Sequence, residues 1–291
     1  METTISNGPV TAVIRHKGAE LSSLFHADTK LEYIWQADPA YWAKSSPVLF
    51  PIVGQLKENT YTYRETEYTL PRHGFAREME FALEKSGPDY ATFLLTSDSN
   101  TRKQYPFDFG LRIHYSISAA GTLEVKYVVT NAGSEPMYFS LGAHPAFRVP
   151  LRDDDDYTDY YLQFDRVENA DRWKISPQGL IANEHEPLLE NTDKLLLRKD
   201  LFYEDALVFK DLVSNEISIR SNNHSHGFTF SYHGFPYFGI WAFRDADFVC
   251  LEPWCGIADH VGHDQRLERK EGIHVLKPNE PWSRAWSVRS F

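Results

Sequence analysis

Cysteine is scarce in this chain of 291 residues, which contains only Cys250 and Cys255. Two cysteines are too few for the disulfide framework that stabilises many small secreted domains. Cys250 lies in an apolar run, so we expect it to be an unreactive core residue. The chain has no nucleophile-elbow pattern and no glycine-rich phosphate loop. The sequence therefore does not support covalent serine or cysteine catalysis, and it does not indicate a nucleotide cofactor.

Basic residues are also in the minority, with 30 Lys and Arg against 41 Asp and Glu and a formal net charge of -11. This balance argues against nucleic-acid binding, which needs a basic surface. No apolar run approaches the roughly 18 residues of a membrane span, and residues 1–10 lack the pattern of a signal peptide. We therefore expect a cytoplasmic protein with no nucleic-acid partner and no membrane association.

Helical signals are few, whereas alternation with a period of two is found along the whole chain. Apolar residues alternate with polar ones over 111–117 and again over 123–129, with a turn at 119–121 between them, which predicts an antiparallel hairpin. The pattern returns in the second half of the chain, at 217–219, 228–232, 238–240 and 286–289. No linker or internal repeat interrupts it. The sequence predicts an all-β protein, a large antiparallel β-sandwich in one domain over 1–291.

Short helical turns are expected at three places. Asp38 can cap a turn over 38–42 that has Pro39 at its first position. Residues 191–197 and 199–202 could each hold a further turn.

The stretch 248–259 attracts most attention as a candidate site. Phe248 to Leu251 predicts a buried strand, and Pro253 is expected to close it directly after Glu252. A carboxylate beside the apolar surface of Trp254 is placed to have a raised pKa and to transfer protons. The alternative is a structural Glu252 that accepts hydrogen bonds from N–H groups of a turn.

Two histidines have neighbours that suggest a function. His73 stands between Pro71 and Gly74, and His144 precedes Pro145 in a loop that follows an expected strand over 137–141, which should break at Gly142. Because the ordinary pKa of histidine is near neutrality, either residue could serve as an acid or a base. The alternative for each is a surface or structural histidine.

Metal sites are weakly indicated. A zinc site could use His73, His144 and Glu252, or the closely spaced pair His224 and His226, which flank a polar turn rather than a rigid element. The acidic run over 153–156 lacks the ligand spacing and glycine of a calcium loop, which favours a solvated loop. We expect no metal site.

Five stretches, in this order, resemble the aldose 1-epimerase (galactose mutarotase) family, particularly its LacX-like branch. They span nearly the whole chain and are Leu-Phe-Pro-Ile-Val-Gly at 49–54, Pro-Arg-His-Gly-Phe-Ala-Arg at 71–77, Ser-Leu-Gly-Ala-His-Pro-Ala-Phe at 140–147, Leu-Phe-Tyr-Glu-Asp-Ala-Leu-Val-Phe at 201–209 and Cys-Leu-Glu-Pro-Trp-Cys-Gly-Ile-Ala-Asp at 250–259. The resemblance implies a galactose mutarotase-like supersandwich. It also implies a cofactor-independent isomerase that interconverts the α and β anomers of a free hexose such as galactose or glucose.

Roles for individual residues follow from the same resemblance. His144 becomes the general acid toward the ring oxygen, Glu252 the base at the C1 hydroxyl, His73 a second active-site histidine, and Asp205 a substrate-binding carboxylate. The chain departs from the family at its substrate arginine, where an Asn-Arg motif is replaced by Gly-Gln-Leu-Lys at 54–57. We expect Arg77 or Lys57 to take over that contact.

Tryptophan is the residue type expected to stack on the sugar, with Trp254 beside Glu252 as the first candidate and Trp35, Trp42 and Trp241 as others. The pH profile is expected to be a bell whose acid limb reports Glu252 and whose alkaline limb reports a histidine.

Two alternatives to a free-hexose mutarotase stay open. One is a hexose-6-phosphate 1-epimerase, which needs a cluster of basic residues such as Lys57, Arg72 and Arg77 to bind phosphate. The other is a non-catalytic sugar-binding module on the same fold. In each case the partner is a small sugar, and the protein is expected to be a monomer or a homodimer.

Overall fold

Antiparallel strands make up most of the computed structural model, which describes residues 1–291. The smaller of the two main sheets has the order β1 (Glu2–Asn7), β2 (Val10–Arg15), β3 (Glu20–His26) and β4 (Leu31–Glu32). The larger sheet has fifteen strands. Its order is β5 (Val48–Leu49), β13 (Leu141–Ala143), β21 (Phe248–Cys255), β20 (Tyr237–Trp241), β17 (Leu207–Phe209), β15 (Tyr160–Ile175), β18 (Glu216–Ser221), β19 (Phe228–Ser231), β23 (Pro281–Ser290), β11 (Leu123–Asn131), β10 (Phe109–Ile117), β9 (Tyr90–Thr96) and β8 (Ala82–Ser86), while β14 (Ala146–Arg148) pairs with β21 and β16 (Ile181–Leu196) with β15.

The remaining elements are short. Two further sheets have two strands each: β6 (Thr60–Tyr63) pairs with β7 (Thr66–Thr69), and β12 (Met137–Phe139) pairs with β22 (His274–Leu276). The helices are α1 (Thr101–Gln104) and the 3-10 turns η1 (Lys57–Asn59), η2 (Ala76–Glu78), η3 (Tyr157–Asp159), η4 (Lys199–Phe202) and η5 (Leu267–Arg269). None of these helices has the length and hydrophobicity needed to cross a bilayer.

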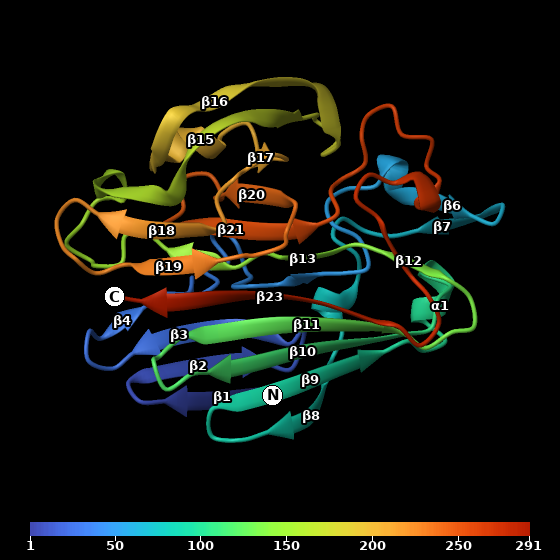
Figure 1. Cartoon of the computed structure of the whole chain (residues 1–291), viewed down its shortest axis with the longest axis horizontal. Helices are drawn as coiled ribbons and strands as arrows, with labels where there is room; N and C mark the ends of the chain where they lie inside the picture. The colour runs from blue at the N-terminus through green and yellow to red at the C-terminus, as the bar shows by residue number, and fades with distance from the viewer.

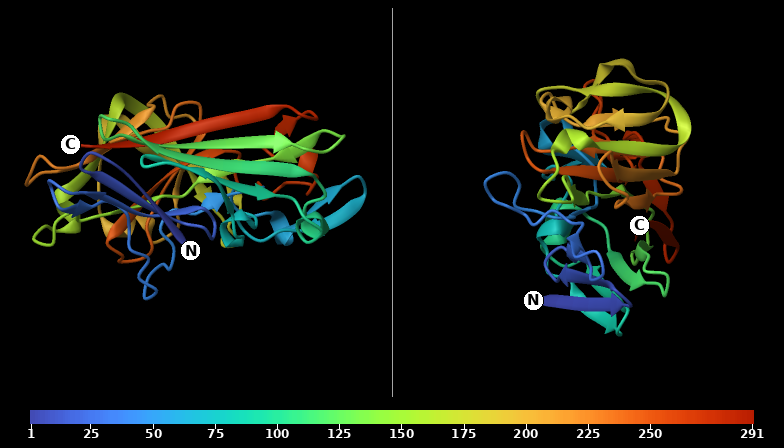
Figure 2. Two further views of the ribbon diagram at one scale, coloured as in Figure 1. Left: turned by 90° about the horizontal axis from the view of Figure 1, so that it is seen from below. Right: turned by 90° about the vertical axis from the view of Figure 1, so that its left-hand side faces the viewer.

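The two main sheets pack face to face at one end of the molecule, which confirms the predicted β-sandwich. The blue N-terminal strands lie against the green strands β8 to β11 and at the end opposite the β15–β16 hairpin (Figures 1 and 2), and β1 contacts both β9 and β10. Inward-facing apolar side chains of both sheets, among them Ile14, Ile113 and Val125, are buried in one continuous core. Burial of this surface is the main stabilising contribution to the fold.

The predicted hairpin over 111–117 and 123–129 is confirmed as β10 and β11, paired with Ile113 opposite Tyr127. Its alternation of apolar and polar residues matches the alternation of buried and partly exposed positions along both strands. The turn predicted at 199–202 is η4.

The helical turn predicted for 191–197 is wrong, because residues 181–196 form β16. Pairing with β15 sets the conformation there, with Leu195 opposite Leu162. Leu195 is buried and Leu196 is 63% exposed, as expected of a strand. The segment 38–42 is a turn rather than a helix, although Asp38 caps it by accepting a hydrogen bond from Ala40 N at 2.9 Å.

The strand break predicted at Gly142 lies two residues earlier. Ser140 separates β12 from β13, and Gly142 is within β13, where it pairs with Trp254. The chain then leaves the sheet at His144 and Pro145 and returns to it in β14.

The predicted end of the central strand at Pro253 is also wrong, because β21 continues through Glu252 and Pro253 to Cys255. On one side β21 pairs with β20 along its length. On the other side it meets β14 first and then β13, with residues 143–145 in the interval. Leu251 N donates to Pro145 O at 3.2 Å in this interval. The backbone nitrogen of Pro253, two residues further on, faces the same interval. Its missing N–H therefore removes no hydrogen bond between paired strands.

Candidate active site

A cavity of about 410 Å³ opens above the middle of β21. Its walls come from segments that are far apart in the sequence: the loops at 54–55 and 72–77, the β13–β14 connection, the segment 202–206, the turn after β20, and β21 itself. The charged and tryptophan residues that line it are Trp42, Arg72, His73, Arg77, His144, Glu204, Asp205, Trp241, Arg244, Glu252 and Trp254. This volume and this mixture of aromatic and polar groups are typical of a small-molecule site.

The closest pair of titratable groups in the cavity is His144 and Glu252. The Nε2 atom of His144 lies 3.4 Å from Oε2 of Glu252, and the two residues are only 7% and 2% exposed. Glu252 projects from a strand held on both sides, and His144 leaves the sheet beside it. The sequence-predicted acid and base are therefore neighbours on a rigid part of the fold.

Aromatic rings hold the His144 imidazole in place. The Trp42 ring stacks on it at a centroid distance of 4.9 Å, and Trp241 contacts it edge-on at 5.5 Å. The carbonyl oxygen of Trp42 accepts a hydrogen bond from Trp35 Nε1 at 2.9 Å. Trp35 thus supports the cavity wall from behind and does not line the cavity.

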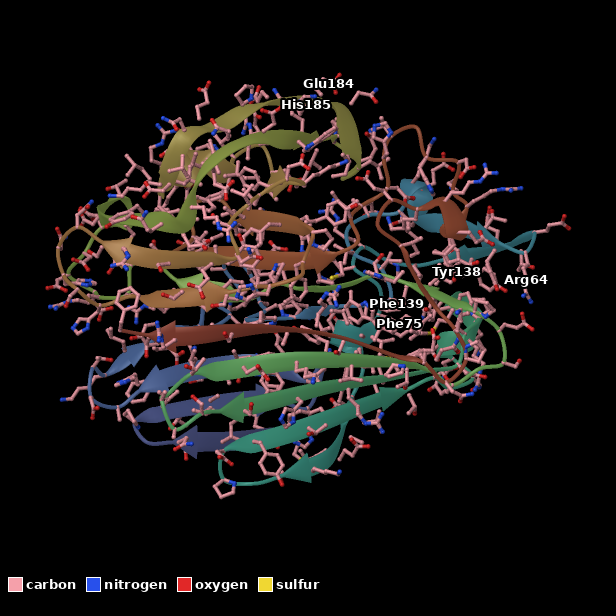
Figure 3. The ribbon with its side chains drawn as sticks, viewed as in Figure 1. Arg64, Phe75, Tyr138, Phe139, Glu184 and His185 are labelled. Carbon is pink, nitrogen blue, oxygen red and sulfur yellow. The ribbon has the colours of Figure 1, made fainter.

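His73 reaches the same cavity through a strained turn. Its φ is +67°, and Gly74 follows with a φ of +70°, where a Cβ would collide with the carbonyl oxygen of Phe50. The His73 and His144 ring centroids are 5.7 Å apart. Beneath this turn Phe75 and Phe139 pack around the Phe50 ring in the interior (Figure 3).

Two hydrogen bonds to Gly54 fix the orientation of His73. Its backbone N donates to Gly54 O at 2.9 Å, and Gly54 N donates to the His73 Nδ1 atom at 3.1 Å. Because Nδ1 accepts a hydrogen bond, it carries no proton in the neutral ring. The proton of the neutral imidazole is therefore on Nε2, which leaves that atom a donor.

A buried ion pair supports the Gly54 segment from the far side. Lys270 Nζ and Asp259 Oδ1 are 2.8 Å apart, and neither side chain has any exposed surface. Asp259 also accepts a hydrogen bond from Lys57 N at 3.0 Å, and its own N donates to Gln55 O at 2.8 Å. Burial lowers the pKa of Lys270, and the Asp259 charge opposes that shift. The pair ties the loop after β21 to the segment that positions His73.

Burial shifts the pKa values of the three candidate catalytic residues in the directions that favour the neutral form of each. It lowers the pKa of His144 to about 3, with the positive charge of Arg77 adding to the effect. It lowers the pKa of His73 well below the ordinary value, and His144, Arg77 and Arg72 contribute.

Burial also raises the pKa of Glu252 well above its ordinary value of 4.5. The Trp254 indole opposes that rise, although its Nε1 makes no hydrogen bond in the structure, and the Asp205 charge adds to it. Within the His144–Glu252 pair, burial therefore favours a proton on Glu252 and a neutral His144.

Arginines occupy one wall of the cavity without carboxylate partners. Arg77 donates through Nη2 to Arg72 O at 2.9 Å, and Arg72 donates through Nε to Gln55 Oε1 at 3.2 Å. Neither guanidinium forms an ion pair within 4.0 Å. Burial and the charge of Arg72 lower the pKa of Arg77, opposed by Glu78. This wall can accept a polar or anionic group of a ligand.

Three buried polar atoms of cavity residues have no hydrogen-bond partner. They are Arg77 Nε, His144 Nδ1 and Trp254 Nε1. Buried polar groups in folded proteins are nearly always paired, so each of these atoms needs a partner, which a water molecule or a ligand can supply.

Six of the seven predicted site residues line this cavity: His73, Arg77, His144, Asp205, Glu252 and Trp254. The exception is Lys57, the proposed substitute for the missing arginine. Its Nζ atom lies 3.4 Å from His263 O, outside the cavity. The backbone of η1 points this side chain away, because Lys57 N is held by Asp259.

The metal candidates outside the catalytic residues, namely the His224–His226 pair and the acidic run, lie elsewhere. His224 and His226 do not line the cavity, and His224 Nε2 is instead 2.8 Å from Asp155 Oδ2. The acidic run is divided among different partners, with Asp153 paired to Arg148 and Asp154 to Arg152. Sequence patterns did not identify Gln55 or Arg244 as cavity residues, because each lies in a loop without a distinctive motif.

Comparison with known proteins agrees with this geometry. The profile described as aldose 1-epimerase matches residues 1–288. Protein LacX (plasmid) of Lactococcus lactis subsp. lactis is 32% identical over 297 residues, covering 99% of each chain.

Two solved structures are similar over the whole fold. The galactose mutarotase related enzyme from Lactobacillus acidophilus superimposes with a TM-score of 0.95 at 35% identity, covering 100% of this chain and 97% of the other. A galactose mutarotase-like protein from Lactobacillus casei gives 0.93 at 30% identity and covers both chains completely.

The fold and the cavity define a β-sandwich protein of the galactose mutarotase-like class. More narrowly, the chain belongs to the aldose 1-epimerase family, a family of isomerases that act on sugars.

Proposed function

We propose that this protein is an aldose 1-epimerase that interconverts the α and β anomers of a free hexose such as galactose or glucose. The observation that carries the proposal is the pair of His144 Nε2 and Glu252 Oε2, 3.4 Å apart in a cavity lined by tryptophans and unpaired polar atoms. Anomer exchange needs one proton removed from the C1 hydroxyl and one delivered to the ring oxygen. An adjacent acid and base supply both, each contributing about 10²–10⁴-fold.

One proton on the His144–Glu252 pair is sufficient for the reaction. In the productive form it resides on His144, which donates it to the ring oxygen while Glu252 accepts the proton of the C1 hydroxyl. The C1–O5 bond breaks, the open-chain aldehyde rotates about C1–C2, and the ring recloses on the other face as the protons return. The other groups bind the sugar: the Nε2–H of His73 and the carboxylate of Asp205 contact hydroxyls, and Trp254 packs against the ring.

Polarimetry on freshly dissolved α-D-galactose and α-D-glucose tests the function. We expect the approach to anomeric equilibrium to speed up in proportion to protein concentration with at least one of these sugars. A folded protein that leaves the buffer rate of both unchanged would favour a sugar-binding module without turnover.

The runner-up substrate is a hexose 6-phosphate, favoured by one specific observation. Arg72 and Arg77 lie together at the cavity without carboxylate partners in a chain whose net charge is -11. Paired guanidinium groups suit a phosphate. We nevertheless expect free hexose to be used at least as well.

Replacing Arg77 distinguishes the two substrates. For a phosphorylated hexose, Arg77→Gln should weaken binding by about 2 kcal/mol or more, because the phosphate loses a buried charged partner. For a free hexose the change should be small. Lys57→Gln is the matched control, because the Lys57 side chain lies outside the cavity. It should alter the binding of neither the phosphorylated nor the free hexose. A wild-type kcat/KM that favours the phosphate by about a hundredfold would make the phosphorylated sugar the substrate.

The pH profile should depart from the one expected with ordinary pKa values. Activity requires one proton on the His144–Glu252 pair. On the acid side it is lost when His144 takes up a second proton, well below histidine's ordinary 6.5, because burial lowers that pKa. On the alkaline side it is lost when Glu252 releases the proton, well above 4.5, because burial raises that pKa.

The acid limb should therefore report His144 and the alkaline limb Glu252, the reverse of the order expected from sequence. Measuring kcat/KM by polarimetry, with the buffer rate subtracted at each pH, should give a broad bell. A narrow bell with limbs near 4.5 and 6.5 would restore the ordinary assignment.

No transition metal should be required for this reaction. His144 and Glu252 must exchange protons with the sugar, and a metal bound to them would prevent that. Elemental analysis of the dialysed protein should find much less than one equivalent of zinc, and chelation should leave activity intact. Stoichiometric zinc that survives dialysis, with activity lost on chelation, would contradict this expectation.

A further inference from the structure

One buried nucleophilic group next to the pair has no part in the proposed chemistry. Cys250 is a free, fully buried thiol. It precedes Glu252 by two residues on β21, and alternate residues of a strand project from the same face. Its Sγ atom, a ring nitrogen of His144 and a carboxylate oxygen of Glu252 all lie within 4.8 Å of one another. The second cysteine, Cys255, is outside this cluster and lies near Gly234.

These three atoms make a ligand set of one nitrogen, one sulfur and one oxygen. Zinc binds such ligands at about 2.0–2.3 Å, and many of its sites use three protein ligands and leave a fourth position open. Ligand atoms on one tetrahedral zinc ion lie less than about 4 Å apart, so a bound ion would draw these three atoms, which now lie within 4.8 Å of one another, closer together. Glu252 and His144 line the cavity, so the fourth position is accessible to water or to a sugar oxygen.

We propose that Cys250, His144 and Glu252 form an inhibitory site for a thiophilic divalent cation of the zinc class. The bound cation takes the imidazole lone pair and the carboxylate oxygen, and both the thiol proton and the proton of the His144–Glu252 pair leave to solvent. The pair then cannot exchange protons with a sugar. Cysteine and histidine ligands exclude magnesium and calcium, which prefer oxygen. The site goes beyond the proposed epimerase function, because its occupation can be observed without turnover.

Cadmium titration tests the site directly through its thiolate absorption in the ultraviolet. We expect wild-type protein, treated with a chelator and then freed of it, to bind about one equivalent of Cd²⁺ with a sulfur-to-metal absorption band. Cys250→Ser should lose the band, whereas the matched control Cys255→Ser should keep it. If Cys250→Ser does not fold, Cys250→Ala and Glu252→Gln serve in its place, and Glu252→Gln should weaken Cd²⁺ binding. A band that persists without Cys250, or no band in wild-type protein, would overturn the proposal.

Zinc inhibition provides the second test. Zn²⁺ should slow anomer exchange by wild-type protein, EDTA should restore the rate, and Mg²⁺ at the same concentration should have no effect. In Cys250→Ala the zinc concentration for half-inhibition should rise by about tenfold or more, since outer-shell partners alone change metal affinity by about 10–100-fold. Equal inhibition of wild-type and Cys250→Ala would overturn the proposal. If no sugar is turned over, the proposed function fails while the cadmium titration still decides the metal site.

Discussion

Replacing Glu252 by Gln should lower kcat by about 10²–10⁴-fold and leave KM nearly unchanged. Gln keeps the shape of the side chain and one acceptor oxygen, but it cannot take the proton of the C1 hydroxyl. An effect on kcat without one on KM is the sign of an interaction needed in the transition state. Polarimetry over a range of sugar concentrations up to saturation measures both constants.

Glu204→Gln is the matched control for this substitution. Glu204 lines the same cavity, but its carboxylate is largely exposed and lies 3.5 Å from Arg172 Nη2 rather than beside His144. It should change kcat by less than tenfold. If Glu252→Gln folds and retains wild-type mutarotation, Glu252 is a structural acceptor and the catalytic assignment is wrong.

The second large effect should be on stability, at the buried ion pair behind the His73 loop. Asp259→Asn leaves the Lys270 ammonium with no counter-ion and no exposed surface. Removing one partner of such a pair costs about 3–5 kcal/mol in the free energy of unfolding. Guanidinium unfolding followed by the fluorescence of the seven tryptophans should show the loss.

Two further variants separate the buried charge from general damage. Combining Asp259→Asn with Lys270→Met removes both charges and should recover part of the stability. Glu135→Gln breaks the exposed pair with Arg64, at the tip of the β6–β7 hairpin (Figure 3), and should leave the unfolding midpoint nearly unchanged. A loss below about 1 kcal/mol for Asp259→Asn would mean that the pair does not hold this loop.

The strands were predictable where one face is buried and the other partly exposed. The β10–β11 hairpin is the best example, because each inward position over 111–117 and 123–129 is apolar and the turn between the strands contains Gly121. Residues 191–197 were mistaken for a helical turn because their conformation depends on pairing with β15, which no local pattern reveals.

The site was predictable in its residue types more than in its geometry. The sequence identified Glu252 and His144 as candidates, but it did not predict how far β21 extends. The interval between β13 and β14 that accommodates Pro253 is a tertiary feature. The sequence could not show that Lys57 is turned away by Asp259, which is 202 positions further along the chain.

The environment of the acid and base was only partly predictable. A raised pKa for Glu252 was expected beside Trp254, and burial does raise it. The lowered pKa of His144 depends on its burial in the tertiary structure, which no local pattern reveals. Cys250 was expected to be an unreactive core residue, and its burial agrees with that. Its place beside His144 and Glu252 follows from strand register, which puts residues 250 and 252 on one face.

The central claim is that His144 and Glu252 act as one proton-exchanging unit on a sugar. The most direct measurement is the rate at which the α and β anomers of galactose or glucose interconvert. One-dimensional NMR follows this rate through the anomeric proton signals, with wild type, His144→Gln, Glu252→Gln and the double variant at equal concentration. We expect wild type to accelerate exchange, each single variant to lose about 10²–10⁴-fold, and the double variant to lose little more than either. Folded single variants that exchange the anomers as fast as wild type, or losses that simply multiply in the double variant, would contradict the claim.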